Sequence, residues 1–428
     1  MAAMRSLRER EIFTRDLRAN PGYELVLSDR LEPELRRALA NLEQDSGFYG
    51  VLRPAPSSPG GRGGGWEERA GEMRVPDGPA LSLKSVDRDT ALLFLSLREP
   101  GPLPAYVRRM AGEGAARVAA QLVADGILEI AAGDGAFVSG AAAFGLLWEE
   151  GAEGRGGRLA ELSLAALRYG QALALAGTAA TAALADPLRL SLRLYGYNRR
   201  PLTPAWKRRL ADAAAVERHL GIGPGGLHRR RLDQGWSRTG SSETWLSWRR
   251  RGSDRDGGGL AAAGATWKLY VSPQPEALAD GFGRILDALT AARTPQFKIG
   301  ADAAGLLRPD KIVAWFGSFE RLAAAADAVT ERLGGTPAQG VPFTSEIGGD
   351  GLLSWGVDPP AGPWSGGESW RLWLTHRLAV ALLAGKLAGK SAETAGGVEP
   401  WRFALERLRL EGVDTDSWTP GGRLFREA

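Results

Sequence analysis

The sequence predicts an α+β protein. It combines a mixed helical N-terminal region that contains a winged-helix-like element with a C-terminal sheet domain whose helices pack on one face. Within residues 113–140 a helical segment is followed by strand, turn and strand, the order of a winged helix, and Asp134-Gly135 is the expected hairpin turn. Within residues 266–335 the order is strand, helix, strand, strand, helix, which gives a sheet with its helices on one side.

The length and composition are those of a globular protein with more than one domain. The chain has 428 residues, of which 44% are hydrophobic and 24% charged. We expect a helical and winged-helix-like region at 1–150, for which leader-peptide binding is one role. A helical, Trp- and Arg-rich connecting region follows at 151–265, and an α+β catalytic-type domain occupies 266–428.

Several classes of function are excluded or disfavoured by composition. There is no cysteine and there are only 3 histidines, so disulfides, thiolate catalysis and Cys- or His-rich metal centres are not expected. The net charge of +4 is spread over interspersed acidic and basic residues, without the concentrated basic face of a nucleic-acid binder. The start of the chain lacks an apolar signal core, and no uncharged run is long enough for a membrane span. We expect a cytoplasmic protein with no metal, cofactor, nucleic-acid or membrane partner.

In the first half of the chain, apolar periodicity and turn residues predict several helices, a linker and a strand. Helices are expected near 5–18 and 30–43, followed by a Gly/Pro/Ser-rich linker at 53–66. The apolar run 91–97 is bounded by charged residues and proline and predicts a buried strand. Ala-rich helices are expected over 143–186.

In the second half, the patterns are stronger and follow one another closely. Gly-, Arg- and Pro-rich composition predicts loops, at 221–240, 250–259 and 341–360. Periodicity predicts strands at 266–272, 297–301 and 310–316 and helices at 275–292, 319–335 and 368–389.

The rare lysines of this chain are the first chemical signal. Only 7 of the 54 Lys and Arg residues are lysine, and several of them fall on or beside the predicted sheet. Strand alternation places Lys268 and Lys298 on the face opposite the apolar residues that meet the helices. Lysine, unlike arginine, loses its proton readily when burial lowers its pKa, so it can act as a base or bind phosphate. With Arg308 and Lys311 these cations predict a phosphate site. The alternative is an ordinary solvated sheet face.

Supporting candidates come from two polar segments. In the segment 194–206, Tyr195, Tyr197 and Asn198 can form a substrate wall, or they can anchor a structural corner. Glu346, in the stretch 341–360, can orient or neutralise the lysines, or it can serve as a turn carboxylate.

The predicted helix 368–389 carries a further group of candidates. Trp370, Trp373 and Leu374 recur at helical spacing and indicate a core face. Arg371 and His376 lie off that stripe. Each can reach an active site, but a solvent-facing position is the simpler interpretation.

Residues of about 190–390 resemble the HopA-like type III effector domain family. The resemblance rests on an ordered set of motifs, namely RLYGYNRRPLTP, a Trp-rich stretch, WKLYVSP with its following helix, FKIG, RPDKIVAWF, VPFTSEIGGDG and SWR. Members of this family also occur in pathways that make class V lanthipeptides and thioamide-containing peptides. There a kinase-like partner phosphorylates Ser or Thr of a precursor peptide, and the HopA-like protein is thought to eliminate the phosphate.

The resemblance therefore implies a phosphoserine/phosphothreonine lyase that leaves a dehydroamino acid. In that reading Lys298, or else Lys268, is the base. The phosphate is bound by Arg308, Lys311 and Arg371. A distinct phosphothreonine lyase family uses a Lys-x-His pair, which is absent here.

The missing Lys-x-His pair leaves the acid open among His376, Tyr270 and a second lysine. Two alternatives to the lyase remain. One is a non-catalytic precursor-peptide-binding or scaffold subunit, in which the wing-like element grips the leader. The other is an effector-type protein-binding module.

Overall fold

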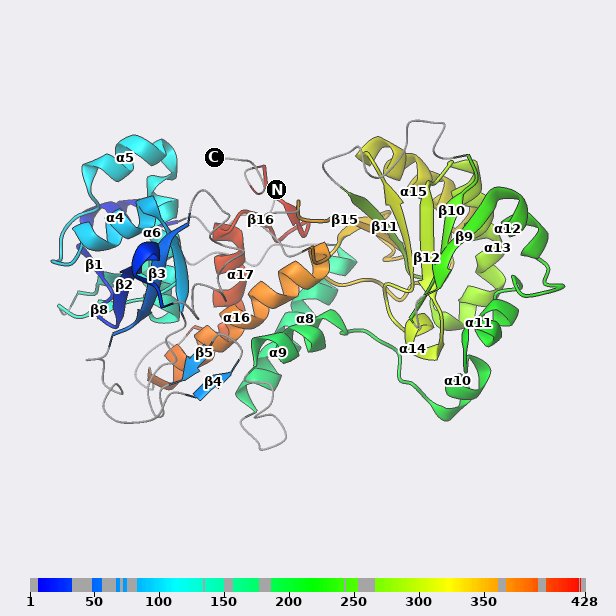
Figure 1. The fold of residues 1–428 in the computed structure, drawn as a ribbon, viewed down its shortest axis with the longest axis horizontal. Coiled ribbons are helices and arrows are strands. Elements are labelled where there is room, and N and C mark those ends of the chain that lie inside the picture. The colour runs from blue at the N-terminus through cyan, green and yellow to red at the C-terminus, as the bar shows by residue number, and fades with distance from the viewer. Residues whose placement is uncertain are drawn as a thin grey trace. The chain divides into compact units, whose positions relative to one another are not determined.

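The structure, a computed structural model, divides the chain into two compact units (Figure 1). Unit 1 comprises Met1–Gly154 and Val380–Glu411, and unit 2 comprises Arg155–Ala379 and Gly412–Ala428. The residues that the structure describes are 7–32, 48–55, 67–69, 72–74, 83–133, 135–149, 157–176, 186–241, 244–252, 266–360, 367–391, 398–422 and 424.

Unit 1 contains the helix and hairpin expected within 113–140. Helix α6 (Ala115–Ala124) is followed by strands β7 (Leu128–Ala131) and β8 (Phe137–Val138). The two strands pair antiparallel, and β1 (Leu17–Ala19) pairs with the other edge of β7. Of the expected turn, Asp134 lies outside the described residues, and Gly135 has a φ of 81°.

Two of the expectations for the N-terminal half were wrong. The helix expected over 5–18 is only α1 (Glu9–Thr14), because the residues after it pair as β1 with β7. The strand expected at 91–97 is instead helix α4 (Arg88–Ser96). Asp87 caps this helix by accepting a hydrogen bond from Thr90 N, and its apolar residues divide into a buried and an exposed face. A short all-apolar run does not distinguish a strand from a helix by periodicity.

The other elements of unit 1 complete its sheets and helices. The expected helix 30–43 lies almost wholly outside the described residues, and so do residues 56–66 of the expected linker, whose first two residues end β3. The remaining bounds are β2 (Tyr23–Leu27), β3 (Phe48–Pro54), β4 (Glu67–Arg69), β5 (Glu72–Arg74), β6 (Lys84–Asp87), α5 (Ala105–Ala111), α7 (Phe144–Leu147) and α17 (Pro400–Leu410).

Unit 2 is built on a seven-stranded antiparallel sheet. Its strands, in spatial order, are β14 (Ser345–Ile347), β15 (Leu353–Val357), β11 (Trp267–Val271), β13 (Ile312–Phe316), β12 (Gln296–Gly300), β10 (Trp245–Arg250) and β9 (Trp236–Ser241). In chain order, β11, α13, β12, β13, α15 and β15 form a split β-α-β unit of the ferredoxin-like kind, in which β13 lies between β11 and β12. The hairpin β9–β10 widens one edge, and β14 widens the other.

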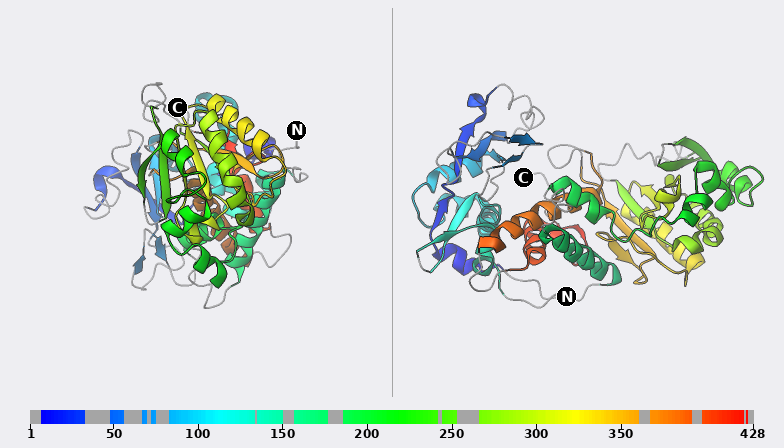
Figure 2. Two further views of the ribbon diagram at one scale, coloured as in Figure 1. Left: turned by 90° about the vertical axis from the view of Figure 1, so that its right-hand side faces the viewer. Right: turned by 90° about the horizontal axis from the view of Figure 1, so that it is seen from below.

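One face of this sheet packs on helices and forms the main core of unit 2. Apolar residues of α13 (Pro275–Ala291) and α15 (Phe319–Leu333) join Leu269, Phe297 and Ile299 in one buried cluster. Helices α11 (Ala213–His219) and α12 (Arg229–Gly235) add to the same cluster, and the green and yellow helices lie in front of the sheet in the left panel of Figure 2. We call the opposite side, which carries Lys268 and Lys298, the polar face.

Two of the three stretches that the composition predicted as loops, 221–240 and 341–360, contain regular elements, so those two expectations were wrong, while most of 250–259 lies outside the described residues. Residues 229–241 form α12 and β9, and residues 345–357 hold the hairpin β14–β15. Glycines 348, 349 and 351 in the turn of this hairpin all have φ near 80°, a conformation that side chains disfavour. The glycines therefore fit the backbone conformation of the turn, and pairing with neighbouring strands makes the residues on either side extended.

The remaining helices of unit 2 complete a mixed α+β fold. They are α8 (Arg158–Leu175), α9 (Pro187–Tyr195), α10 (Pro204–Arg209), α14 (Ala303–Leu306) and the first part of α16 (Trp370–Ser391), which continues into unit 1 from Val380, and a short hairpin of β16 (Val413–Asp414) and β17 (Thr419–Pro420) follows. The start of α16 reaches the polar face at β15, where a Cβ on Gly356 would come within 3.0 Å of the Trp370 ring. Within the described part of the chain, no helix has the length and apolarity needed to cross a membrane.

Candidate functional site

The polar face of the sheet brings three of the predicted cations together. Lys268 lies on β11, Lys298 on β12, and Arg308 just before β13. The strand alternation read from the sequence is confirmed, because Leu269, Phe297 and Ile299 face the helices while the lysines do not.

Lys298 lies between two tryptophans on the polar face. Its Nζ is 3.9 Å from the ring centroid of Trp245 on β10 and 5.2 Å from that of Trp315 on β13. The indole faces attract an ammonium group but accept no proton from it. Burial, followed by the charge of Lys268, lowers the pKa of Lys298 to about 8, although Asp310 and Asp358 oppose this.

Lys298 and Lys268 differ in their hydrogen-bond and ion-pair partners. Among the residues that the structure describes, its Nζ has no hydrogen bond and no ion pair. Lys268, by contrast, forms a close ion pair with Asp358, whose other carboxylate oxygen accepts from Trp370 N at the start of α16. The charge of Lys268 is therefore balanced by Asp358, whereas Lys298 has no counterion among the described residues and has a lowered pKa.

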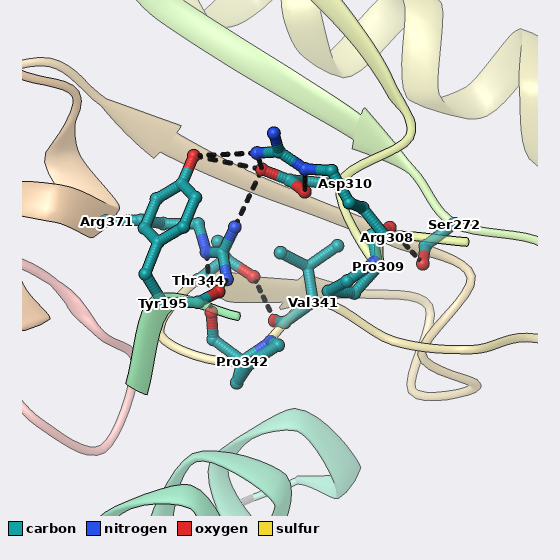
Figure 3. A network of polar contacts seen from close by, with 9 residues as sticks. All are labelled: Tyr195, Ser272, Arg308, Pro309, Asp310, Val341, Pro342, Thr344 and Arg371. Carbon is teal, nitrogen blue, oxygen red and sulfur yellow. Dashed lines mark hydrogen bonds and ion pairs between the residues drawn. The ribbon is translucent and has the colours of Figure 1, made fainter. Parts of the chain in front are cut away.

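A buried carboxylate, Asp310, organises the arginines beside these lysines (Figure 3). Arg308 forms a two-pronged contact with it, Nε to Oδ1 at 2.9 Å and Nη2 to Oδ2 at 2.8 Å. Arg371 reaches the same Oδ2 at 2.9 Å from α16, and the Tyr195 hydroxyl donates to it at 3.0 Å. Two arginines and a phenol thus converge on one carboxylate.

The charges around Asp310 set its ionisation. Burial by itself would raise the pKa of Asp310, but the Arg371 and Arg308 guanidiniums, with hydrogen bonds from Arg308 and Tyr195, hold it far below its usual value. The same carboxylate outweighs burial at Arg308, whose pKa is raised above its ordinary value. Asp310 and Arg308 are therefore both charged throughout the physiological pH range.

The polar face carries more positive than negative charge. Asp310 is shared by two arginines and Asp358 is paired with Lys268, so two positive charges remain without a carboxylate. Arg308 is 18% exposed, and its Cζ lies 5.0 Å from the Trp245 ring that also contacts Lys298. While Lys298 is protonated, this excess matches a phosphomonoester dianion, which carries about two negative charges.

Lys311 lies away from the surface of the site. Its side chain is fully buried, and Nζ donates to Pro273 O at 2.9 Å and to Gln339 Oε1 at 2.6 Å. Burial lowers the pKa of Lys311 to about 7, although Asp310 and Glu276 oppose this. Direct phosphate contact, expected from the sequence, requires an exposed ammonium group, which Lys311 lacks.

The polar segments around 198 and 346 hold the fold of unit 2 together. Asn198 has a φ of 65°, and its Nδ2 donates to the backbone oxygens of Gln339 and Gly340. This is the structural corner that the sequence offered as the alternative to a substrate wall. Tyr197 packs on Tyr169 of α8, with ring centroids 5.5 Å apart.

Glu346 also lies away from the lysines. It accepts a hydrogen bond from Leu159 N, in the first turn of α8. A carboxylate there stabilises the N-terminus of the helix. Glu346 therefore positions α8 rather than the cations of the sheet.

The α16 candidates divide in two. Trp370, Trp373 and Leu374 are buried, which confirms the core face. The solvent-facing interpretation of Arg371 was wrong, because its side chain is 1% exposed and also donates to Pro342 O and Tyr195 O. His376 is exposed. The charged groups that influence its imidazole are Arg377, Glu368 and Asp186, and none of them belongs to the site.

Tyr270 remains as a candidate proton donor. It lies on β11 two residues from Lys268, on the polar face, and is buried. Burial, followed by the nearby Asp358 carboxylate, raises the pKa of Tyr270 well above its ordinary value. Its hydroxyl is therefore protonated at neutral pH.

Sequence reasoning missed three residues of this site, namely Asp310, Trp245 and Arg199. Asp310 is the one carboxylate in RPDK, a signal that was present in the motif itself. Trp245 gave no signal, because its contact with Lys298 depends on pairing between β10 and β12. The side chain of Arg199 reaches solvent. Partial desolvation of its guanidinium, followed by the charge of the neighbouring Arg308, lowers the pKa of Arg199. It adds a cation at the rim of the site.

Comparison with known proteins gave weak structural neighbours only. No protein-family model and no curated protein matches the chain. An effector protein from Pseudomonas syringae pv. tomato strain DC3000 is 9% identical, with a TM-score of 0.34 over 62% of this chain and 99% of that one. An effector protein from Pseudomonas syringae pv. syringae strain 61 is 15% identical, with a TM-score of 0.32 over 62% and 100% of the two chains. From likeness at this level we draw no functional conclusion, and the proposals below rest on the side chains of the site.

Proposed function

We propose that the polar face of unit 2 eliminates phosphate from phosphoserine or phosphothreonine in a peptide, with Lys298 as the base. The observation that carries the proposal is a half-buried lysine with no carboxylate partner among the described residues, a pKa of about 8, and an arginine beside the same tryptophan. A base that is partly neutral near pH 8 and a cation for the leaving phosphate are the two groups that this reaction requires.

The chemistry follows from the positions of these groups. Neutral Lys298 takes the Cα proton, the electron pair forms the Cα–Cβ double bond, and the Cβ–O bond breaks. The phosphate leaves with the bonding electrons and is stabilised by Arg308, whose position is fixed by Asp310. Lys268 adds positive potential, and Tyr270 is a neutral hydroxyl that can protonate the leaving oxygen. The products are a dehydroamino acid and inorganic phosphate. Lys298 then gives its proton to solvent, and Tyr270, having protonated the leaving oxygen, regains one from solvent.

The substrate in this proposal is a precursor peptide that a kinase-like partner has phosphorylated. Synthetic phosphothreonine and phosphoserine peptides are direct probes of the reaction. Incubation with the full-length protein should give loss of phosphoric acid by mass spectrometry, and an added thiol should trap the dehydroamino acid. An intact phosphopeptide after binding saturates would refute the lyase.

A binding function without chemistry is the second candidate. With a pKa of about 8, Lys298 is mostly protonated at pH 7, and it then serves as a phosphate ligand. A scaffold subunit, or an effector-type module that binds phosphorylated proteins, would show phosphate-dependent binding and no turnover. Both candidates therefore predict binding of the same phosphopeptide, and only the lyase predicts that the peptide loses its phosphate.

The pH dependence of turnover follows from Lys298. The base must be neutral, so kcat should rise about tenfold per pH unit below pH 8 and level off above it, since the pKa is about 8. The peptide phosphate titrates only at the low end of this range, because its second pKa is about 6, and it is mostly a dianion above about pH 7. Rates measured at constant ionic strength from pH 6 to 10 test this. A midpoint near 10.4, the value of an ordinary lysine, would contradict the assignment.

We expect Arg308 to contribute to the binding of phosphorylated peptide and not to the binding of unphosphorylated peptide. Arg308→Gln removes the charge but leaves an amide that can still donate to Asp310. We expect phosphopeptide binding to weaken by about 1.5–3 kcal/mol and unphosphorylated binding to change little. Arg284→Gln, at an exposed arginine of α13 that donates to Arg332 O, is the control and should leave both affinities unchanged. Equal weakening for both peptides would give Arg308 a structural role.

A further inference from the structure

A second hollow of unit 2 lies on the helix side of the sheet, at the edge formed by β9. This cavity, of about 240 Å³, has a floor of buried apolar side chains, among them Trp236 and Trp248. Its wall carries three arginines, Arg229, Arg238 and Arg251. Lys298 is on the opposite face of the same sheet, so the two sites are distinct.

The arginines of this cavity are only partly satisfied by the protein. Arg238 contacts Glu217 at 2.6 Å, Arg229 contacts Asp233 at 2.8 Å, and Arg251 Nε donates to Asp233 O at 2.9 Å. A guanidinium has five N–H donors, so in the contacts of the described residues most donors of each remain for a ligand. The three guanidiniums outnumber the two carboxylates of the wall. A more open hollow shares Arg229 and Asp233 and adds Arg230, so the basic surface continues along α12.

The strand beside this cavity ends the sheet. Among the described residues, β9 pairs with β10 alone, and its other edge has no strand partner. Figure 1 shows β9 next to α12 at this edge. A free strand edge presents backbone N–H and C=O groups in a row, which an extended peptide can pair with. Trp236 and Arg238 of this same strand line the cavity, so a paired peptide would lay alternate side chains toward it.

We propose that an extended acidic peptide segment adds to β9 and places side chains in the arginine-lined cavity. The charge of the wall selects carboxylates, the tryptophan floor accepts apolar side chains, and the strand edge supplies the main-chain hydrogen bonds. A nucleic-acid strand lacks the regularly spaced backbone N–H and C=O groups that pair with a strand edge, so the free edge of β9 favours a peptide. This inference rests on the proposed function only in taking the segment to be part of the peptide substrate.

The geometry sets the spacing within such a substrate. A strand added outside β9 lies three strand spacings from β12, which is about 14 Å, and Lys298 faces the other side of the sheet. At about 3.3 Å per residue, roughly five or more residues must separate the acidic segment from the phosphorylated residue. In a phosphopeptide with enough residues between the two, the acidic segment should lower KM. Phosphopeptides with a shorter separation should show no such decrease in KM, while their kcat should be unchanged.

Binding is tested without any elimination, using the full-length protein and a fluorescein-labelled peptide of alternating glutamate and valine. We expect saturable binding, and at least tenfold weaker binding of the matched lysine–valine peptide. Arg229→Gln and Arg238→Gln should each weaken the acidic peptide by roughly tenfold, as expected for a lost charge-assisted contact. Arg284→Gln is the matched control and should have no effect. Equal binding of the acidic and basic peptides, or no effect of either cavity variant, would overturn the proposal.

Strand addition is tested by N-methylation of alternate residues, either every valine or every glutamate. Only one edge of an added strand faces β9, so one methylated series should lose binding and the other should keep it. Equal affinities of the two series would overturn the pairing, and tighter binding of a single-stranded oligonucleotide than of the peptide would assign the surface to nucleic acid. Lys298→Arg should leave this binding unchanged. Acidic-peptide binding, together with no elimination from a bound phosphopeptide, would therefore refute the lyase and leave this site intact.

Discussion

Lys298→Arg should abolish elimination while phosphopeptide binding is retained. Arginine keeps the positive charge next to Trp245 but stays protonated, so it cannot take the Cα proton. Removing a general base typically costs about 10²–10⁴ in rate, so kcat should fall by at least two orders of magnitude. Single-turnover mass spectrometry of the phosphopeptide, with binding by fluorescence anisotropy, measures both quantities.

Two lysine variants make this result specific. Lys207→Arg, at an exposed lysine of α10, should have wild-type kcat. Lys268→Arg keeps a cation that can pair with Asp358, so it should retain most of the turnover, with a shifted pH profile because the charge next to Lys298 moves. If Lys298→Arg turns over at the wild-type rate, Lys298 is not the base. If Lys268→Arg alone is inactive, the base is Lys268.

Asp310→Asn should destabilise unit 2 by about 3–5 kcal/mol, the usual cost of leaving a buried charge without its partner. Arg371 is 1% exposed, and asparagine would leave its guanidinium without a carboxylate. Urea unfolding followed by tryptophan fluorescence reports on unit 2, which holds most of the tryptophans. Asp327→Asn, at an exposed carboxylate of α15, is the control and should change the free energy of unfolding by less than about 0.5 kcal/mol.

The pH dependence of this loss has a definite sign. The pKa of Asp310 is lowered in the folded protein, so its contribution is fully present above the unfolded pKa, about 3.9, and is lost as the pH falls further. The difference in stability between wild type and Asp310→Asn should thus be constant above about pH 5 and shrink below about pH 4. A difference that stays constant into acid would mean that the charge of Asp310 contributes little.

Much of the unit 2 sheet could be predicted because its signals are local. Alternation in WKLYV and QFKIG assigned Lys268 and Lys298 to the face away from the helices, and the structure agrees. The helices α13 and α15 show the 3.6-residue apolar period over four turns, which is the most reliable local pattern. These elements carry their own pattern, so no knowledge of distant residues was needed.

Where the predictions were wrong, the decisive contact is distant in sequence. The 345–357 hairpin is rich in turn residues, yet β15 is held by five pairs with β11, more than 80 residues away. The 91–97 run has no periodicity of its own, and as part of α4 it packs on β3, more than 30 residues earlier in the chain. Composition measures local preference, and sheet pairing overrides it.

The sequence by itself determined the α+β class, the polar face of the sheet and the two lysines on it, because strand alternation follows from backbone geometry. Only the tertiary structure decided which cations are free to act. It paired Lys268 with Asp358, buried Lys311 against Gln339 and left Lys298 over Trp245 without a counterion among the described residues. A pKa depends on burial and on charges brought close by folding, and neither is written in the order of residues along one strand.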